Sequence, residues 1–205
     1  RELKGIYLAL EMLSQQNRVL AGMKFKDSEL VNAKGKKVLV IGGGDTGSDC
    51  IGTAHRQGAV SVTQIEIMPE PPVGYNPATP WPNWPNIKKT TSSHKEGCER
   101  RWLLNSNRFI GKDGKLVGVE VEGVIWEPNP DGGRPIMKLD GKKEIIDCDM
   151  VLLAMGFIKP EHPKYADNVF LVGDAASGAS LVVRAIASGR KVADQIDAYV
   201  NGIKK

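Results

Sequence analysis

The chain has 205 residues, of which 41% are hydrophobic and 25% are charged. These proportions are typical of globular proteins, so they exclude intrinsic disorder and fibrous repeats. The 28 basic and 24 acidic side chains leave a net charge of +4, an excess too small and too dispersed to predict a nucleic-acid partner.

The sequence predicts no membrane helix and no metal site. Its longest nearly unbroken apolar run, residues 150–158, has nine residues, whereas a membrane span needs about 20. The three cysteines lie far apart without metal-ligand spacing, which argues against a disulfide framework as well. We therefore expect a cytoplasmic protein.

A helix and a connector are predicted first. Apolar residues recur at intervals of three and four over residues 1–20, as an amphipathic helix requires. Residues 21–36 are mostly polar, with glycines among them. A domain boundary is therefore predicted near Gly35.

A strand–helix–strand unit is predicted next. Lys37–Ile41 is a short apolar run, typical of a strand buried on both faces of a parallel sheet. A helix is predicted from Asp45 to Gln57, and Val60–Ile67 is rich in β-branched residues, as strands are. Together these elements form a βαβ unit.

A proline-rich loop and a β-meander follow. Seven of the 12 prolines lie between Pro69 and Pro85, where neither a helix nor a central strand is expected. Strand-like runs separated by turn sequences come after this loop. The runs are residues 102–110, 116–126, 135–139 and 144–146, with turns at 112–115, 131–133 and 140–141.

The chain closes with two apolar runs and a long amphipathic segment. Asp149–Met155 and Asn168–Val172 are predicted as buried strands, and Leu181–Val200 as a helix. The two ends of the chain are expected to form one domain and the middle another.

A glycine motif lies between the strand at Lys37–Ile41 and the following helix. In dinucleotide-binding folds, the first glycine of G-x-G-x-x-G permits a tight turn, the second lets a pyrophosphate approach, and the third lets the helix pack closely. The N–H groups at the helix start then bind phosphate. A glycine-rich turn without a ligand is the alternative, which the flanking elements disfavour. The motif is Gly42-Gly43-Gly44-Asp45-Thr46-Gly47.

Glu66 ends the second predicted strand, about 20 residues after the glycines. An acid at this place accepts hydrogen bonds from the ribose 2′-hydroxyl and repels a 2′-phosphate, which favours NADH over NADPH. Arg56, Lys88 or Lys89 could instead bind a 2′-phosphate. A merely solvated glutamate is the plain alternative.

Gly173 and Asp174 follow another predicted strand, and Ser180, Leu181 and Val182 open the last helix. Such an aspartate can accept hydrogen bonds from a polyol chain, and a helix start can stabilise negative charge on a ring system. A turn aspartate with an N-capping serine is the alternative. The histidines and cysteines show no catalytic arrangement, so we expect no catalytic side chain.

Several strings of the sequence jointly resemble the small (beta) subunit of glutamate synthase, over nearly the whole chain. They are residues 38–53 (VLVIGGGDTGSDCIGT), 65–72 (IEIMPEPP), 80–85 (PWPNWP), 152–157 (LLAMGF), 172–176 (VGDAA) and 180–186 (SLVVRAI).

The resemblance implies an α/β fold: a Rossmann-like nucleotide-binding domain with a β-meander insertion, plus a partial second, FAD-type dinucleotide-binding domain. Electrons would pass from NADH or NADPH through FAD towards iron–sulfur clusters and the FMN of a large subunit. There, glutamine and 2-oxoglutarate would become two glutamates. The implied domains are 1–36, a helix and connector from the partial FAD domain; 37–156, the NAD(P)H-binding domain; and 157–205, the return segment of the FAD domain.

The resemblance also implies cofactor contacts. Residues 42–47 would hold the nucleotide pyrophosphate, and Asp49 would lie near the nicotinamide. The residues implied on the FAD side are Met155 and Gly156 at the crossover, Gly173 and Asp174 at the ribityl and pyrophosphate groups, and Ser180, Leu181 and Val182 at the isoalloxazine.

The sequence also departs from the family's pattern. Cysteines for iron–sulfur clusters and a first glycine-rich fingerprint have no counterpart before Gly42, and the segment between Phe157 and Asn168 is short. We therefore expect a carboxy-terminal fragment or truncated product with an incomplete FAD site, inactive alone. We also expect it to form a homodimer or a soluble aggregate through uncovered apolar surface. The large subunit and the missing amino-terminal portion would be its partners.

Two other functions stay open. The chain could be a module that binds NAD(H) without turning it over, or the reductase portion of a related flavin and iron–sulfur enzyme.

Overall fold

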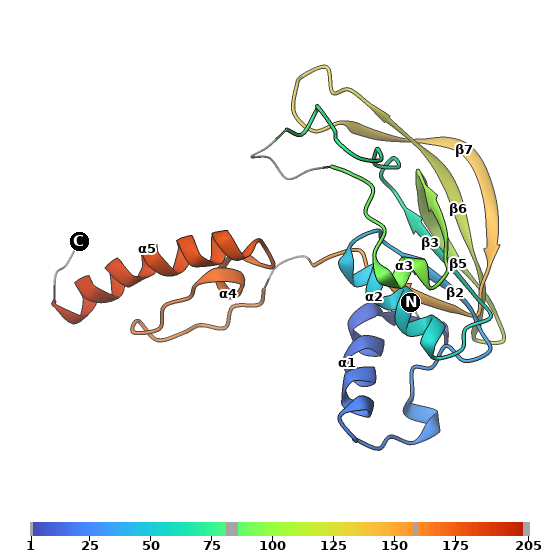
Figure 1. Ribbon diagram of the computed structural model, residues 1–205, viewed down its shortest axis with the longest axis horizontal. Helices are drawn as coiled ribbons and strands as arrows, with labels where there is room; N and C mark the ends of the chain where they lie inside the picture. Colours follow the sequence, from blue (N-terminus) through green and yellow to red (C-terminus); the bar gives the residue numbers. More distant parts are fainter. Residues whose placement is uncertain (1, 81–85, 158–159, 203–205) are drawn as a thin grey trace. The chain divides into compact units, whose positions relative to one another are not determined.

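The computed structural model describes residues 2–80, 86–157 and 160–202 (Figure 1). The chain divides into two compact units, Arg1–Met155 and Gly156–Lys205. No helix in the described ranges is long and apolar enough to cross a membrane. Part of the predicted proline loop, residues 81–85, lies outside the described residues.

A parallel five-stranded sheet forms the centre of the first unit. Its strand order is β1-β8-β2-β3-β4, and every neighbouring pair is parallel. The predicted βαβ unit is confirmed by β2 and β3, which flank the helix α2. The strands are β1 (Ile6–Leu8), β2 (Lys37–Ile41), β3 (Ser61–Glu66), β4 (Glu99–Trp102) and β8 (Met150–Leu153).

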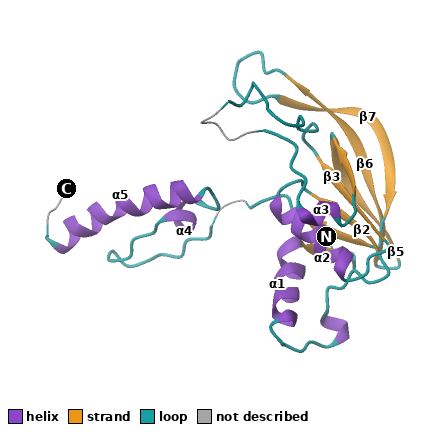
Figure 2. Ribbon diagram, in the orientation of Figure 1, coloured by secondary structure: helices purple, strands orange, loops and turns teal. Residues whose placement is uncertain are grey.

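Helices and a second sheet cover the two faces of this parallel sheet. Val38 and Val40 of β2 pack into the core beneath the helices, whereas Leu39 and Ile41 pack into the core beneath the second sheet. Burial on both faces is the reason β2 is continuously apolar. Figure 2 shows the helices of this unit in purple beside the strands. They are α1 (Ala9–Leu20), the short 3₁₀ helix η1 (Asp27–Glu29), α2 (Asp45–Arg56) and α3 (Ser92–Lys95).

The second sheet is the predicted β-meander. Its three antiparallel strands, β5 (Leu104–Lys112), β6 (Lys115–Glu127) and β7 (Ile136–Asp147), lie in the order β5-β6-β7. Asp113 and Gly114 join β5 to β6 with φ of 50° and 73°, as a two-residue type I′ turn requires. The predicted fold class, a Rossmann-like α/β domain with a β-meander insertion, is confirmed.

Two predicted boundaries in this region are wrong. The run 102–110 is divided at Leu103, whose φ of 56° turns the chain from the parallel sheet into the meander. The predicted turn at 140–141 is a bulge inside β7, because the pairing with β6 shifts between Glu122 and Val124. The Asp140 side chain lies against Gly123 there.

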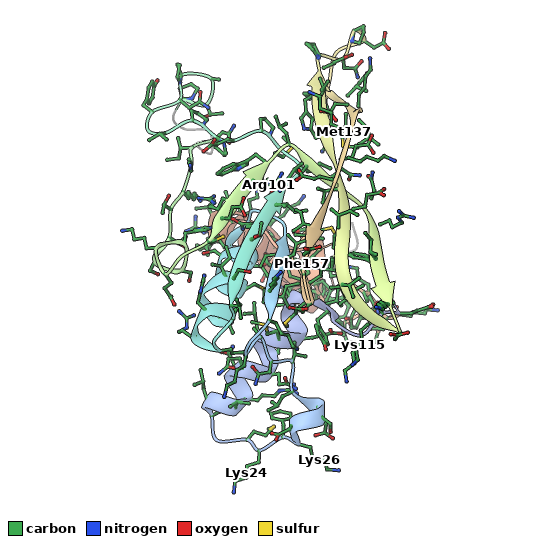
Figure 3. The ribbon with its side chains drawn as sticks, turned by 90° about the vertical axis from the view of Figure 1, so that its right-hand side faces the viewer. Lys24, Lys26, Arg101, Lys115, Met137 and Phe157 are labelled. Carbon is green, nitrogen blue, oxygen red and sulfur yellow. The ribbon has the colours of Figure 1, made fainter. Side chains whose placement is uncertain are left out.

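The start of the chain also differs from the prediction. The helix expected over residues 1–20 begins only at Ala9, because Ile6–Leu8 pairs with β8 as an edge strand. Residues 1–36, expected as a helix and connector from a partial FAD domain, lie in the first unit. Lys24 and Lys26 extend from the connector after α1 (Figure 3).

The second unit contains the helices α4 (Gly173–Ser177) and α5 (Val182–Val200), which confirm the predicted final helix. The strand predicted at Asn168–Val172 does not form. The described residues of this unit include no strand to supply hydrogen-bonding partners, and an unpaired strand is unstable. Phe170 instead packs edge-on against Tyr199 of α5, with ring centroids 5.6 Å apart.

Candidate functional site

The glycine motif forms a tight turn between β2 and α2. Gly42 has a φ of 121°, and a Cβ there would overlap the backbone of Ala154 at the end of β8. A Cβ on Gly47 would overlap the Gly42 carbonyl oxygen. The glycine turn therefore contacts the start of α2 at positions where only glycine fits.

The start of α2 is open. Gly44 is its N-cap, and no described atom lies within 4 Å of a Cβ built on Gly44. The first N–H groups of a helix lack partners within the helix, so this opening can receive an anion. Asp45 is exposed at the opening, Thr46 is half-buried, and Asp49 is exposed one turn further along.

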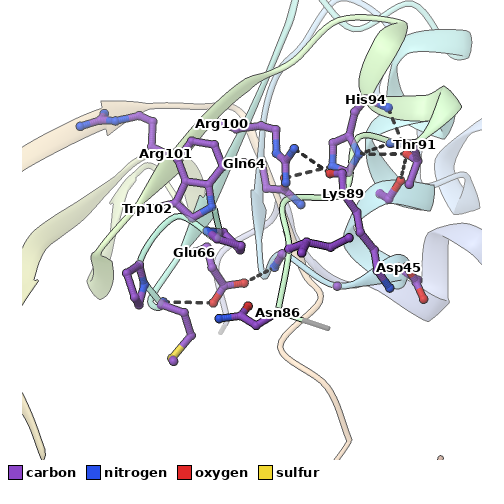
Figure 4. Close-up of a pocket in the computed structure, with 17 residues that line it drawn as sticks. Asp45, Gln64, Glu66, Asn86, Lys89, Thr91, His94, Arg100, Arg101 and Trp102 are labelled. Atoms are coloured by element: carbon purple, nitrogen blue, oxygen red, sulfur yellow. Dashed lines mark hydrogen bonds between the residues drawn. The ribbon is translucent and has the colours of Figure 1, made fainter. Parts of the chain in front are cut away.

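A pocket of about 270 Å³ adjoins this opening (Figure 4). Its walls come from the start of α2, the carboxyl ends of β3 and β4, and the segment between them. Binding at the carboxyl ends of parallel strands is the rule in such sheets. The lining residues are Gly43, Gly44, Asp45, Ser48, Gln64, Glu66, Met68, Pro69, Pro71, Asn86, Ile87, Lys89, Thr91, His94, Arg100, Arg101 and Trp102.

Glu66 lies in the pocket beside the glycine turn, at the end of β3. Its carboxylate accepts a hydrogen bond from the Gly43 N–H, and its Oε1 accepts others from Ile67 N (2.9 Å) and Met68 N (3.3 Å). These donors fix the carboxylate beside the helix start. The structure thus brings the two predicted parts of the nucleotide site together.

Arg100 of β4 brings a cation into the same pocket. Its Nη1 donates to the Lys89 carbonyl oxygen (3.0 Å), and its guanidinium carbon is 5.1 Å from the ring centroid of Trp102. Its Nε is buried without a hydrogen-bond partner, and within the described ranges no carboxylate pairs with it. Arg101 pairs with Glu144.

The cations that the sequence offered for a 2′-phosphate are mostly engaged elsewhere. Arg56 pairs with Glu96 and Lys88 pairs with Glu70, and neither lines the pocket. Only Lys89 of the three does. Sequence reasoning missed Arg100 because a residue of the fourth strand reaches this pocket only through the pairing of β3 with β4.

A chain of buried and half-buried polar side chains lies behind the glycine turn. Gln64 donates through Nε2 to the Gly42 carbonyl oxygen (2.9 Å), and its Oε1 lies 3.3 Å from Nε2 of His94. The pKa of His94 is lowered from its usual 6.5 by burial and, secondarily, by the nearby Arg100. Thr91 and Ser48 continue the chain to α2.

The second unit holds the other predicted residues. Oδ1 of Asp174 accepts hydrogen bonds from the backbone N (3.2 Å) and hydroxyl (3.3 Å) of Ser180. Asp174 and Gly156 line one pocket of about 580 Å³, while Gly173 is buried and bonded to Ser188. Met155, Leu181 and Val182 are exposed.

The three cysteines are free thiols that burial keeps protonated. Burial raises the pKa of Cys50 and of Cys148 to about 12, and that of Cys98 to about 11. Because the thiolate is the reactive form, none is suited to nucleophilic chemistry at neutral pH.

Comparison with solved structures places the fold. FprA from Mycobacterium tuberculosis in complex with NADPH aligns with a TM-score of 0.65 at 14% identity, over 100% of this chain and 62% of FprA. Thioredoxin reductase of T. acidophilum aligns with a TM-score of 0.52 at 19% identity, over 83% of this chain and 54% of that chain. The chain thus has the fold of the thioredoxin-reductase-like oxidoreductases.

Sequence comparison is more specific, although no protein-family model matches. The small chain of glutamate synthase [NADPH] from Mycobacterium tuberculosis is 40% identical over 98% of this chain, which spans 46% of that relative. The corresponding small chain of Escherichia coli is 31% identical over 94% of this chain and 45% of its own length. Glutamate synthase [NADH] of Saccharomyces cerevisiae is 35% identical over 98% of this chain and 11% of its length.

These relatives confirm the resemblance to glutamate synthase. The chain is similar over nearly its whole length to glutamate synthase small chains, and it spans about half the length of the bacterial small chains it matches.

Proposed function

We propose that this chain is the nucleotide-binding portion of a glutamate synthase small subunit and takes up electrons from NADH or NADPH. The observation that carries this proposal is the open start of α2 at Gly44, which adjoins Glu66 in one pocket. Sequence similarity over nearly the whole chain to small chains named for NADPH supports it.

Each part of a dinucleotide has a matching part of this pocket. The pyrophosphate would receive N–H donors at residues 42–47, where the start of α2 favours negative charge. The ribose hydroxyls would reach Glu66, which lies beside the turn. Arg100 and Trp102 would border the adenosine end, and the nicotinamide would extend towards Asp49.

NADH preference follows from Glu66, whose charge repels a 2′-phosphate. Arg100 opposes this preference, because its cation lies in the same pocket without a carboxylate partner in the described part of the chain. The ratio of the two affinities therefore depends on the balance of these two side chains.

The second unit suits part of an FAD site. Gly156 and Asp174 line one pocket there, and Ser180 is hydrogen-bonded to Asp174, so the groups assigned to the flavin lie together. Gly173, Leu181 and Val182 flank this cluster in sequence, and Met155 immediately precedes the unit. FAD, when bound, supplies the acceptor for the nicotinamide hydride.

The chain's own contribution to the transfer is to orient the nucleotide and exclude water, with no acid–base side chain. Electrons would continue through iron–sulfur clusters to a large subunit, where glutamine and 2-oxoglutarate yield two glutamates. That large subunit and an FAD and iron–sulfur portion are the proposed partners.

A calorimetric titration with NADH and NADPH, after a visible spectrum for flavin, tests the proposal. Saturable binding that is lost in Gly44→Ala but kept in Gly189→Ala is expected, because a methyl group at Gly44 occupies the opening whereas Gly189 lies in α5. Absence of binding, or equal binding by both variants, would refute it.

A nucleotide-binding module without turnover is the second candidate, because the pocket at the start of α2 is lined by residues of the first unit alone. NADH oxidation with added FAD and a dye acceptor separates the two. Binding without oxidation would favour the module.

A further inference from the structure

The Gly42 carbonyl is held by a buried side chain. Gln64, on β3, is only 2% exposed, and its Nε2 donates to this carbonyl oxygen over 2.9 Å. A Cβ on Gly47 would lie 3.0 Å from the same Nε2. Gln64 therefore sits directly beneath the contact between the glycine turn and α2, and its amide determines how that turn is oriented.

The orientation of the Gln64 amide depends in turn on His94. The Thr91 backbone N–H points at Nδ1 of His94 over 3.2 Å. A backbone N–H only donates, so Nδ1 must accept, and the neutral imidazole then carries its proton on Nε2. Nε2 lies 3.3 Å from Oε1 of Gln64 and donates to it, which leaves the Gln64 NH₂ for Gly42.

The other end of this chain is anchored on α2. The Thr91 Oγ1 accepts from the His94 backbone N (3.3 Å) and lies 2.5 Å from Oγ of Ser48, which is 4% exposed. One set of hydrogen bonds thus joins the glycine turn, β3, α3 and α2 beside the pocket. Figure 4 shows three of its members, Gln64, His94 and Thr91. Polar groups linked in this way lose several partners when one member changes.

Protonation of His94 disturbs this arrangement. A proton on Nδ1 would face the Thr91 N–H, 3.2 Å away, so two donors would oppose each other, and the acceptor left for that proton is the Thr91 Oγ1, 2.9 Å from Nδ1. The charged group that lowers the pKa of His94, after burial, is Arg100 on β4. Asp45 on α2, Glu66 on β3 and Lys89 on the intervening segment line the same pocket. The neutral imidazole is therefore the form that the folded chain stabilises.

We propose that His94 is a positioning residue for nucleotide binding: its neutral imidazole holds Gln64, and through it the Gly42 carbonyl, in the arrangement that presents the start of α2 to a pyrophosphate. This inference rests on the proposed function of the same site. When Nδ1 of His94 takes up a proton, Nε2 can still donate to Gln64, but the Thr91 N–H loses its acceptor. The ring is then displaced from Thr91, and the turn loses the support that His94 gives it through Gln64. Nucleotide affinity then falls as the pH drops below the ordinary imidazole pKa of 6.5.

The first test is a calorimetric titration with NAD⁺ at about pH 8 and about pH 5.5. Wild type is expected to bind about tenfold more weakly at the lower pH, the equivalent of one hydrogen bond. His94→Gln can replace the acceptor and the donor without titrating, so its affinity should change less with pH. His55→Gln is the matched control, because His55 binds the Gly97 carbonyl outside this chain of bonds. A His94→Gln pH profile equal to that of wild type would overturn the proposal.

The second test needs no nucleotide. The backbone amide resonances of Gly42, Gly43 and Gly44 are followed against pH by NMR in the free chain. We expect them to titrate with the midpoint of the His94 imidazole in wild type and His55→Gln, and not in His94→Gln. Glycine amide resonances that do not change at the midpoint of the His94 titration would refute the positioning role. If they follow it but NAD⁺ does not bind, the proposed function fails while the positioning role stands.

Discussion

Individual glycines of the turn perform different tasks that substitution can separate. Gly42→Ala combines a φ of 121° with an overlap on the Ala154 backbone, so we expect a loss of about 1–3 kcal/mol in the free energy of unfolding. Gly44→Ala has ordinary φ and open space, so its stability should change by no more than about 0.5 kcal/mol. Chemical denaturation measures both. Equal destabilisation by the two substitutions would contradict this geometry.

Glu66 is expected to set nucleotide preference at the same turn. Glu66→Gln removes the charge that repels a 2′-phosphate, so affinity for NADPH should rise relative to NADH. Gln also lacks the second oxygen that accepts the Gly43 N–H, and binding of both nucleotides should therefore weaken. Calorimetric titration of the variant gives the ratio, and an unchanged ratio would remove Glu66 from the ribose site.

Arg100 should act in the opposite direction. Arg100→Gln removes the pocket cation that has no carboxylate partner among the described residues, so NADPH affinity should fall by about tenfold or more relative to NADH. Arg101→Gln is the matched control, because Arg101 lines the pocket but is paired with Glu144. If Arg101→Gln changed the ratio of NADPH to NADH affinity equally, Arg100 would not be the residue that binds the 2′-phosphate.

At the scale of elements, the cysteines report how tightly helices and strands are packed. Cys50 lies buried on α2, Cys148 lies buried before β8, and Cys98 is half-buried before β4. Burial raises the pKa of Cys98 from 9.0 to about 11, which lowers its thiolate fraction at pH 8 about 100-fold. We expect slow labelling by a thiol reagent, first at Cys98, with each site located by mass spectrometry. Faster labelling of Cys50 would show that α2 opens locally.

The elements that sequence could predict are those whose signals are local. β2 and α2 follow from an apolar run, a glycine turn and a helical period that adjoin in sequence. The division at Leu103 was not predicted, because the apolar pattern continues through this residue. The end of β4 is set by its pairing with β3, which stops at Trp102. The run Asn168–Val172 has strand composition but no strand beside it.

The candidate site shows the same limit. Gly42 to Gly47 and Glu66 were found because their spacing is that of a βαβ unit. His94 and Arg100 were not, because their roles depend on contacts across the sheet edge: His94 with Gln64, and Arg100 with the Lys89 carbonyl. The residues next to His94 and Arg100 in the sequence do not indicate these contacts.

At the scale of the whole molecule, the second unit is the less self-sufficient of the two. Its 19-residue helix α5 has no buried residue, and it exposes Val182, Val183 and Ile186 near its start. Helices gain most of their stability from packing an apolar face, and exposed apolar patches favour association. We therefore expect the full chain to form a homodimer that covers α5.

Light scattering of the full chain would then give about twice the monomer mass of 22.3 kDa. Ile186→Asp places a charge on the exposed apolar stretch and should shift the mass towards that of the monomer, since an unpaired charge is costly to bury. Gln195→Asp adds the same charge at another exposed position of α5 and should leave the mass unchanged. A monomer in all three proteins would show that α5 stays uncovered, and rapid amide hydrogen exchange along α5 would then be expected instead.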